Sequence, residues 1–151
     1  MGLRLTRAAD YAVRAMIHIG SLPEDCVALK DDIADAQHIP PSFTAKILRD
    51  LVKAGLLHSA RGVNGGFGLA REAAKVNLLD VVEAIEGPIR LNDCVPDPDS
   101  CALSHDCPVS TVWLEVQNRM TALLRETTLE ALLAARRKNR RALNKMELRS
   151  S

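Results

Sequence analysis

The spacing of apolar residues along the chain predicts a mainly helical protein. In three successive segments the apolar residues recur at steps of three and four, which places them on one face of a helix, and glycine or proline follows each segment. Thr6 is a suitable cap for the first helix, and Pro41 suits the first turn of the third. The three predicted helices cover residues 6–20, 30–36 and 41–54.

A hairpin is predicted directly after the third helix. Two short apolar segments, LLHSA at 56–60 and FGLA at 67–70, flank the turn sequence RGVNGG. Asn64-Gly65 is a dipeptide that readily forms a two-residue hairpin turn, so we expect two antiparallel strands joined there. This order of elements is that of a winged helix-turn-helix, whose third helix enters the major groove of duplex DNA. The open alternative is a helical hairpin and a wing that are used only for protein contacts.

The second half of the chain predicts three further helices. Asn77 can cap the segment LLDVVEAIEG, and from Val109 apolar residues follow one face of a long helix. Thr127 and Glu130 match a capping box, which predicts a break before a short final helix, LEALLAA. A one-sided helix on a domain with its own core needs a partner, so we expect a symmetrical homodimer.

These elements predict an α+β fold that is mainly helical, with a winged helix-turn-helix domain followed by a long C-terminal dimerisation helix. The predicted parts are a DNA-binding domain at 1–87, a cysteine loop at 88–108, the dimerisation helix with a short terminal helix at 109–135, and a flexible basic tail at 136–151.

Composition narrows the class of protein. The chain has 151 residues, 47% of them apolar, and no apolar run approaches the ~18 residues of a membrane span, so we expect no membrane association. The first twenty residues mix arginines and an aspartate with apolar residues, unlike a secretory signal. A cytoplasmic location with reduced thiols is therefore expected.

The net charge of +1 hides an uneven distribution of charged residues. Residues 1–71 contain nine basic and seven acidic residues, residues 72–110 contain two and eight, and residues 111–151 contain nine and four. A solvated tail is the simpler interpretation of RRKNRR at 136–141, and a nucleic-acid arm is the alternative. With only four aromatic residues, the chain lacks a platform for stacking unpaired bases, which favours duplex DNA.

The candidate DNA contacts are polar residues of the third helix and of the hairpin. On the third helix they are expected to lie away from the apolar face, and in the hairpin the glycines would let the backbone approach DNA closely. The candidates are Ser42, Thr44, Lys46, Ser59, Arg61, Gly62, Asn64, Gly65 and Gly66.

Three of the four cysteines fall in one polar segment, CVPDPDSCALSHDCP, as Cys94, Cys101 and Cys107. Thiolates are the soft ligands that iron–sulfur clusters take, and an irregular loop lets three of them converge. Two alternatives stay open: structural zinc with His105 or an aspartate as fourth ligand, and a thiol–disulfide switch. Zinc sites more often contain a tight cysteine pair, which is absent here. Cys26 is expected to be a small buried apolar residue.

The segments RLTRAADYAVRAM at 4–16, PSFTAKILRDLVKAGLLHSARGVNGGFGLAR at 41–71 and LLDVVEAIEG at 78–87 resemble the Rrf-two family of bacterial regulators, over about residues 4–133. The resemblance implies a dimeric winged-helix transcription factor that binds a pseudo-palindromic DNA operator. In its IscR, NsrR and RirA types, three cysteines of the loop before the long helix hold an iron–sulfur cluster. Here these positions are Cys94, Cys101 and Cys107.

The fourth cluster ligand differs between types within the resemblance. The IscR type uses a histidine three residues after the last cysteine, where this chain has Ser110. The NsrR type uses an aspartate in the first helix of the other subunit, which corresponds to Asp10, and His105 is the runner-up. Asp10 favours a 4Fe-4S over a 2Fe-2S cluster.

The function expected from the resemblance is that of a cluster-dependent repressor that senses nitric oxide, redox state or iron and cluster status. A winged-helix regulator with zinc or a thiol switch in place of the cluster is the alternative. An iron–sulfur enzyme or electron carrier is less supported, because no paired carboxylates, nucleophile and base, or phosphate-binding glycine loop stands out.

Overall fold

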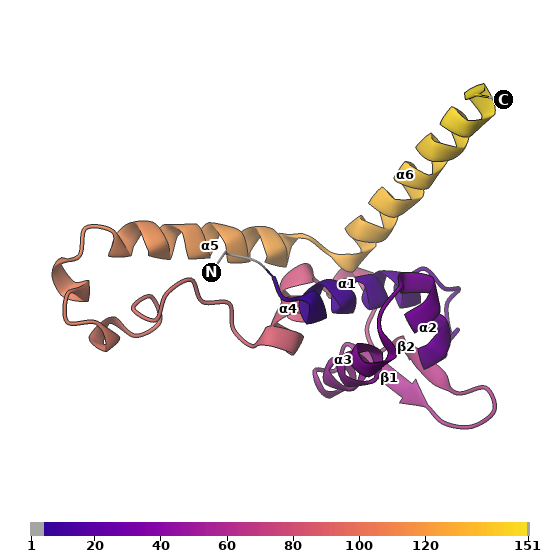
Figure 1. The fold of residues 1–151 in the computed structure, drawn as a ribbon, viewed down its shortest axis with the longest axis horizontal. Helices are drawn as coiled ribbons and strands as arrows, with labels where there is room; N and C mark the ends of the chain where they lie inside the picture. Colours follow the sequence, from indigo (N-terminus) through magenta and orange to yellow (C-terminus); the bar gives the residue numbers. More distant parts are fainter. Residues whose placement is uncertain (1–4, 151) are drawn as a thin grey trace.

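The computed structural model describes residues 5–150, and Figure 1 shows a head domain (residues 5–87) from which two further helices extend. The helices are α1 (Arg7–Gly20), α2 (Lys30–Gln37), α3 (Pro41–Lys53), α4 (Leu78–Glu86), α5 (Ser110–Glu126) and α6 (Leu129–Ser150). The strands are β1 (Leu57–Ala60) and β2 (Gly66–Leu69), and single 3₁₀ turns occur at η1 (Ala73–Lys75), η2 (Pro98–Ser100) and η3 (Ser104–Asp106). The predicted fold class, a mainly helical winged helix-turn-helix with a long C-terminal helix, is confirmed.

The caps read from the sequence define the ends of the head's helices. The side chain of Thr6 accepts a hydrogen bond from the Ala9 amide, and Asn77 forms a capping box with Asp80 at the start of α4. After α3, Gly55 adopts a φ of +71°, the left-handed conformation that ends a helix. These boundaries set α3 at a fixed position relative to the hairpin that follows it.

The core of the head lies around α1, which packs against α2, α3, α4, α6 and β2. Large side chains from four of the helices, from the start of β1 and from the segments that lead into β1 and α4 are fully buried there. They include Met16, Ile33, Leu48, Leu51, Leu56, Leu57, Val76 and Val82. Burial of these apolar side chains is the main source of the head's stability.

The hairpin forms as predicted, but its turn is built differently. Strands β1 and β2 are antiparallel, with Leu57 opposite Leu69 and Ala60 opposite Gly66. Five residues therefore separate the paired strand ends, which is too many for a two-residue Asn-Gly turn. The positive φ angles fall at Gly62 and Gly66 instead, and the Gly65 amide donates to the Gly62 carbonyl at 3.0 Å. The prediction of an Asn64-Gly65 turn is wrong.

The last helix is longer than predicted and begins with a different cap. Thr128, rather than Thr127, caps α6 by accepting a hydrogen bond from the Ala131 amide at 3.1 Å, while the Thr127 hydroxyl donates to the Leu123 carbonyl. The helix continues through the basic segment because alanine, leucine, arginine and lysine favour helix and no glycine or proline interrupts residues 129–150. The predicted short final helix is therefore wrong. None of the helices in residues 5–150 is long and apolar enough to cross a membrane.

Candidate nucleic-acid interface and cysteine loop

One face of α3 is free for a ligand, while the opposite face is buried in the head. The buried residues are Thr44, Ile47, Leu48 and Leu51, and the exposed residues are Ser42, Phe43, Ala45, Lys46, Arg49 and Lys53. Lys46 forms an ion pair with Asp50 at 2.8 Å, whereas no ion pair among the described residues includes Arg49. The exposed stripe is polar and basic, as a major-groove surface requires.

Of the three residues of this helix predicted to contact DNA, Ser42 and Lys46 are exposed, as such a contact requires, whereas the prediction is wrong for Thr44. Thr44 is 1% exposed and its hydroxyl donates to the Pro40 carbonyl at 3.1 Å, so it cannot face a groove. Positions 44, 47, 48 and 51 share a helical face, and the hydroxyl remains satisfied by its own backbone. The sequence analysis did not include Arg49 among the candidate DNA contacts. Its position three residues after Lys46 and seven after Ser42 places it on the same helical face, and this spacing could have identified it.

Phe43 lies four residues before the buried Ile47, yet it is 39% exposed. Its ring packs edge-on against Tyr11 of α1, with ring centroids 5.5 Å apart, and the Arg14 guanidinium lies 5.5 Å from the Tyr11 centroid on the same surface. Arg14 also forms an ion pair with Asp10 at 2.7 Å. These contacts connect the start of α1 to the first turn of α3.

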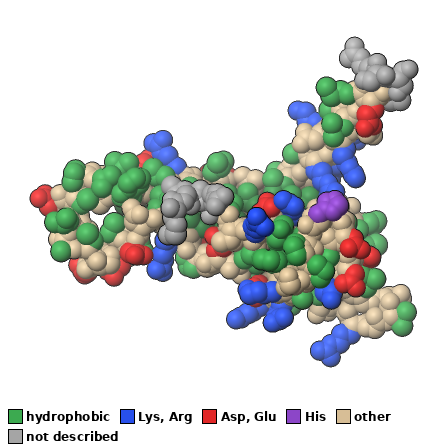
Figure 2. Space-filling view, in the orientation of Figure 1, with side chains coloured by type: hydrophobic (Ala, Val, Ile, Leu, Met, Phe, Trp, Pro, Cys, Tyr) green, Lys and Arg blue, Asp and Glu red, His purple; other side chains and the backbone are tan. Residues whose placement is uncertain are grey.

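The hairpin presents part of the predicted contact set to solvent. Ser59, Arg61, Gly62 and Asn64 are exposed. Figure 2 shows Lys and Arg side chains over the lower surface of the head, where α3 and the hairpin lie in Figure 1. A basic surface with these two elements side by side is suited to the phosphate backbone and groove of a duplex.

Two hairpin glycines serve packing within the protein. Gly65 is buried, and a Cβ there would lie 2.5 Å from the Ala60 carbonyl oxygen, so the prediction that Gly65 contacts DNA is wrong. Gly66 has a φ of +152°, and a Cβ there would lie 2.6 Å from the Ala28 carbonyl oxygen. Ala28 forms a bridge with Phe67, so the glycine admits a third chain segment beside the hairpin.

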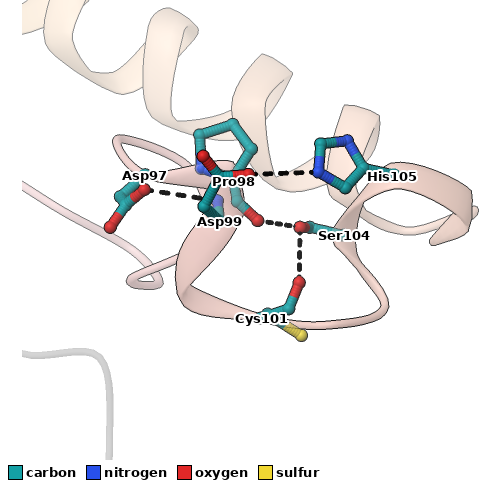
Figure 3. Close-up of polar contacts among 6 residues, drawn as sticks. All are labelled: Asp97, Pro98, Asp99, Cys101, Ser104 and His105. Atoms are coloured by element: carbon teal, nitrogen blue, oxygen red, sulfur yellow. Dashed lines mark hydrogen bonds and ion pairs between the residues drawn. The ribbon is translucent and has the colours of Figure 1, made fainter.

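The cysteine loop connects α4 to α5 and extends away from the head, beside and beyond α5 (Figure 1). Its two 3₁₀ turns are joined by polar contacts, which Figure 3 shows: the Ser104 hydroxyl donates to the carbonyls of Pro98 and Cys101, and His105 lies 3.2 Å from the Asp99 carboxylate. The Cys101 sulfur points outward from this turn (Figure 3). The loop thus has a local structure without regular strands or long helices.

The four cysteines are all free thiols. Cys101 is exposed, and Cys94 and Cys107 are half-buried. Within residues 5–150, no three His, Cys, Asp or Glu side chains lie close enough to hold one metal ion together. A single chain in this conformation therefore places the three predicted cluster ligands on one loop but does not gather their sulfurs.

The two candidates for a fourth ligand lie far apart in the fold. Asp10 is in the first turn of α1, ion-paired to Arg14, and His105 is in the cysteine loop beside Asp99. Cys26 was predicted to be buried, but it is exposed in the polar turn between α1 and α2, where its amide donates to the Pro23 carbonyl. The proline and acidic residues next to Cys26 in this turn are typical of an exposed segment, and they could have predicted its exposure.

An apolar surface runs along α5, none of whose residues is buried. Figure 2 shows hydrophobic side chains over this helix. The exposed apolar residues include Val109 (39% exposed), Val112 (52%), Val116 (43%) and Leu123 (66%). Contiguous apolar patches of this kind are rare on a surface that faces only water.

Comparisons with known proteins agree with this architecture. A helix-turn-helix-type regulator assigned in Mycobacterium tuberculosis (strain H37Rv) is 36% identical over 130 residues, which cover 84% of this chain and 79% of that protein. The regulator IscR of Xenorhabdus nematophila is 28% identical over 131 residues, with 87% and 79% coverage. The regulator NsrR of Shouchella clausii is 26% identical over 132 residues, with 87% and 89% coverage.

Solved structures show the same fold. CymR, described as the global cysteine regulator of B. subtilis, matches with a TM-score of 0.74 and 22% identity, covering 89% of this chain and 98% of that one. IscR of T. potens matches with a TM-score of 0.72 and 25% identity, covering 89% of each chain. The family model for Rrf2, described as an iron-dependent transcriptional regulator, matches residues 5–135. This chain therefore belongs to the Rrf2 (Rrf-two) family of transcriptional regulators.

Proposed function

We propose that the protein is a homodimeric, iron–sulfur-dependent repressor that binds a pseudo-palindromic DNA operator in the cytoplasm and senses nitric oxide, redox state or iron and cluster status. The observation that carries this proposal is the presence of three free thiols on one irregular loop of an Rrf2-family chain. Cys94, Cys101 and Cys107 are the proposed ligands.

The donor set fits an iron–sulfur cluster in its chemistry. Three thiolates are soft ligands, and the loop around them contains only two single-turn 3₁₀ elements, so its backbone can rearrange locally to gather the sulfurs. A bound cluster, with 4Fe-4S favoured over 2Fe-2S, would supply a centre that reacts with nitric oxide or oxygen. Residues 72–110 carry a net charge of −6, which favours a low reduction potential.

The cluster proposal is tested on protein purified without oxygen, by its visible absorption and its iron, sulfide and zinc contents. Replacing Cys94, Cys101 or Cys107 by Ser should each remove the visible bands and the iron. Cys26→Ser is the matched control and should keep both, because Cys26 lies in the α1–α2 turn. A colourless zinc protein would contradict the proposal, and so would a metal-free protein that forms a disulfide on oxidation.

Asp10 of one subunit is the proposed fourth ligand for the loop of the other, with His105 as runner-up. Mixed dimers with Asp10→Ala on one chain and Cys101→Ala on the other test this arrangement. If the ligand crosses between subunits, both defects fall on the same site, so about half of the iron should remain with an unchanged spectrum. A mixed dimer without any native site would instead pair Asp10 with the cysteines of its own chain, and an Asp10→Ala homodimer with an unchanged spectrum would exclude Asp10 as a ligand.

The apolar face of α5 is the proposed dimer interface. Val116→Glu places a charge on this face and should convert the dimer to a monomer in sedimentation, because an unpaired carboxylate is costly to bury. Asn118→Glu adds the same charge on the opposite, exposed face of α5 and should leave the dimer intact. Equal effects of the two substitutions would argue against this interface.

Duplex binding is proposed for the exposed face of α3 together with Ser59, Arg61, Gly62 and Asn64. The operator can be obtained by selection from a random-sequence duplex pool, and two inverted half-sites about one helical turn or a multiple apart are expected. Arg61→Ala should weaken binding and make log affinity less steep in log salt, by ~1 unit for each phosphate that the dimer no longer binds. Arg125→Ala removes an exposed charge from α5 and should change neither quantity.

We include Arg49 in the proposed DNA interface because of its position in the structure. It is exposed on the same stripe as Ser42 and Lys46, and arginine is the residue that most often recognises guanine in the major groove. If Arg49 reads a base, Arg49→Ala should relax the sequence preference at one position of each half-site. A uniform loss of affinity for all sequences would instead place Arg49 on phosphate.

A further inference from the structure

The outer part of α6 stands clear of the rest of the protein. Leu129 and Leu133 are buried in the core, and the Arg136 guanidinium lies 3.5 Å from the Ile17 carbonyl and the Ser21 hydroxyl. From position 137 to position 147 every residue is exposed. Figure 1 shows this segment, called here the basic arm (residues 137–147), rising from the side of α1 that is opposite α3 and the hairpin.

The basic arm carries a concentrated positive charge. Its five cations are Arg137, Lys138, Arg140, Arg141 and Lys145, against one carboxylate, Glu147. No ion pair among the described residues joins any of these five cations to a carboxylate. Arg137, Arg141 and Lys145 follow one another at four-residue spacing, so like charges are neighbours on the helix and repel each other. A bound polyanion would replace this repulsion by attraction.

The spacing of the arm's cations suits a phosphodiester strand. Ala134, Arg137, Lys138, Arg141, Ala142 and Lys145 border a shallow, open hollow along one face of α6. The small alanines let a strand lie close to the helix while the long cationic side chains reach its phosphates. From Arg137 to Lys145 the helix rises ~12 Å, which is about the rise of three to four nucleotides of one strand.

A lipid surface fits the arm less well. Helices that lie on membranes present a continuous apolar face opposite their basic face. The large apolar residues exposed on the arm are Leu143 (60% exposed) and Met146 (67%), one turn apart, and the turns between them and the head expose cations and Asn139. The chemistry of the arm therefore favours nucleic acid over an anionic membrane.

We propose that the basic arm binds the phosphate backbone of a second duplex DNA segment, separate from the operator held by α3 and the hairpin. The arm leaves the head on the side opposite α3 and the hairpin, so an operator bound by α3 is not the DNA segment that the arm faces (Figure 1). The protein would then bridge two DNA segments, a role that goes beyond operator binding but rests on the proposed function for its first duplex.

The experiment uses the full-length protein and two DNA probes. An immobilised duplex carrying the selected operator captures the protein, and a labelled duplex without an operator is added as the second segment. The wild-type protein should retain the labelled duplex, and retention should fall steeply with salt. Arg137→Gln/Arg141→Gln should reduce retention at least tenfold and lower the salt slope by about 2, at ~0.9 per phosphate contact. The same variant should still bind the operator with unchanged affinity, which also shows that it is folded.

The matched control removes cations that lie outside the arm. Arg90→Gln/Arg125→Gln removes two exposed cations outside the arm and should leave retention unchanged. The proposal is overturned if the arm variant retains the second duplex normally, if it loses operator affinity instead, or if only vesicles of anionic lipid bind the arm. A wild-type protein that binds the operator but retains no second duplex overturns this inference alone. A wild-type protein that binds no selected duplex refutes the proposed function as well.

Discussion

Replacing Gly66 by Ala should destabilise the protein strongly, because this glycine lies where a third segment joins the hairpin. Its φ of +152° is one that side chains rarely adopt, at a cost of about 1–3 kcal/mol. The added Cβ would also lie 2.6 Å from the Ala28 carbonyl oxygen and 2.9 Å from its carbon, and this backbone cannot rotate away. Something must shift, and the two hydrogen bonds between Ala28 and Phe67, at 2.8 and 2.9 Å, are the interactions at risk.

The total loss follows from these contributions. Each backbone hydrogen bond contributes about 0.5–1.5 kcal/mol, so the expected loss for Gly66→Ala is about 2–6 kcal/mol of the free energy of unfolding. Gly62→Ala is the matched control, since Gly62 also has a positive φ, +104°, but nothing lies within 4 Å of its Cβ position. The two variants should therefore differ by about 1–3 kcal/mol. Urea unfolding at one fixed protein concentration measures this difference, and equal losses would refute the steric argument.

Two further predictions concern the buried Thr44 and the half-buried His18. Thr44→Val removes the hydroxyl that donates to its own helix and should cost about 1 kcal/mol of stability without changing operator affinity, measured by urea unfolding and DNA titration. Burial, together with the positive charge of Arg136 on α6, lowers the pKa of His18 below its usual 6.5, although Asp32 on α2 opposes this. The folded protein therefore favours neutral His18, and this contribution to the free energy of unfolding is complete above about pH 6.5 and is lost as the pH falls through the lowered pKa. In the wild-type protein the free energy of unfolding should thus decline as the pH falls from about 7 to about 5, and His18→Gln should make this decline smaller.

The sequence was sufficient to predict the helices of the head because their signals are local. Caps such as Thr6 and Asn77 and the glycine after α3 act within one turn, and the structure confirms them. The hairpin turn was predicted wrongly because the choice between a two-residue and a five-residue loop depends on the strand register. That register includes the contact of Ala28 with Phe67, which is distant in sequence.

The candidate site was partly predictable for the same reason. Exposure of Ser42, Lys46 and Arg61 follows from helical spacing and turn chemistry. Thr44 was misplaced because a polar residue was assumed to face solvent, whereas its hydroxyl bonds to the preceding turn and its methyl group joins the core. The three loop cysteines are not gathered in the structure, and the cluster that the proposed function requires would have to bring them together, which no local sequence pattern determines.

A short series of contacts connects Asp10, the proposed fourth cluster ligand, to α3, the proposed DNA-binding helix. Its carboxylate is already bound to Arg14, which lies over the Tyr11 ring, and Tyr11 packs edge-on against Phe43 in the first turn of α3. A carboxylate that takes a new partner binds its former partner less strongly, so a new bond at Asp10 would weaken its ion pair with Arg14 near the first turn of α3. Helix α1 also packs against α2, α4, β2 and α6, so a displacement of its first turn would change its packing against these elements of the head. If these contacts carry the proposed response, replacing Arg14, Tyr11 or Phe43 should change how strongly operator affinity depends on the cluster while leaving the preferred operator sequence the same.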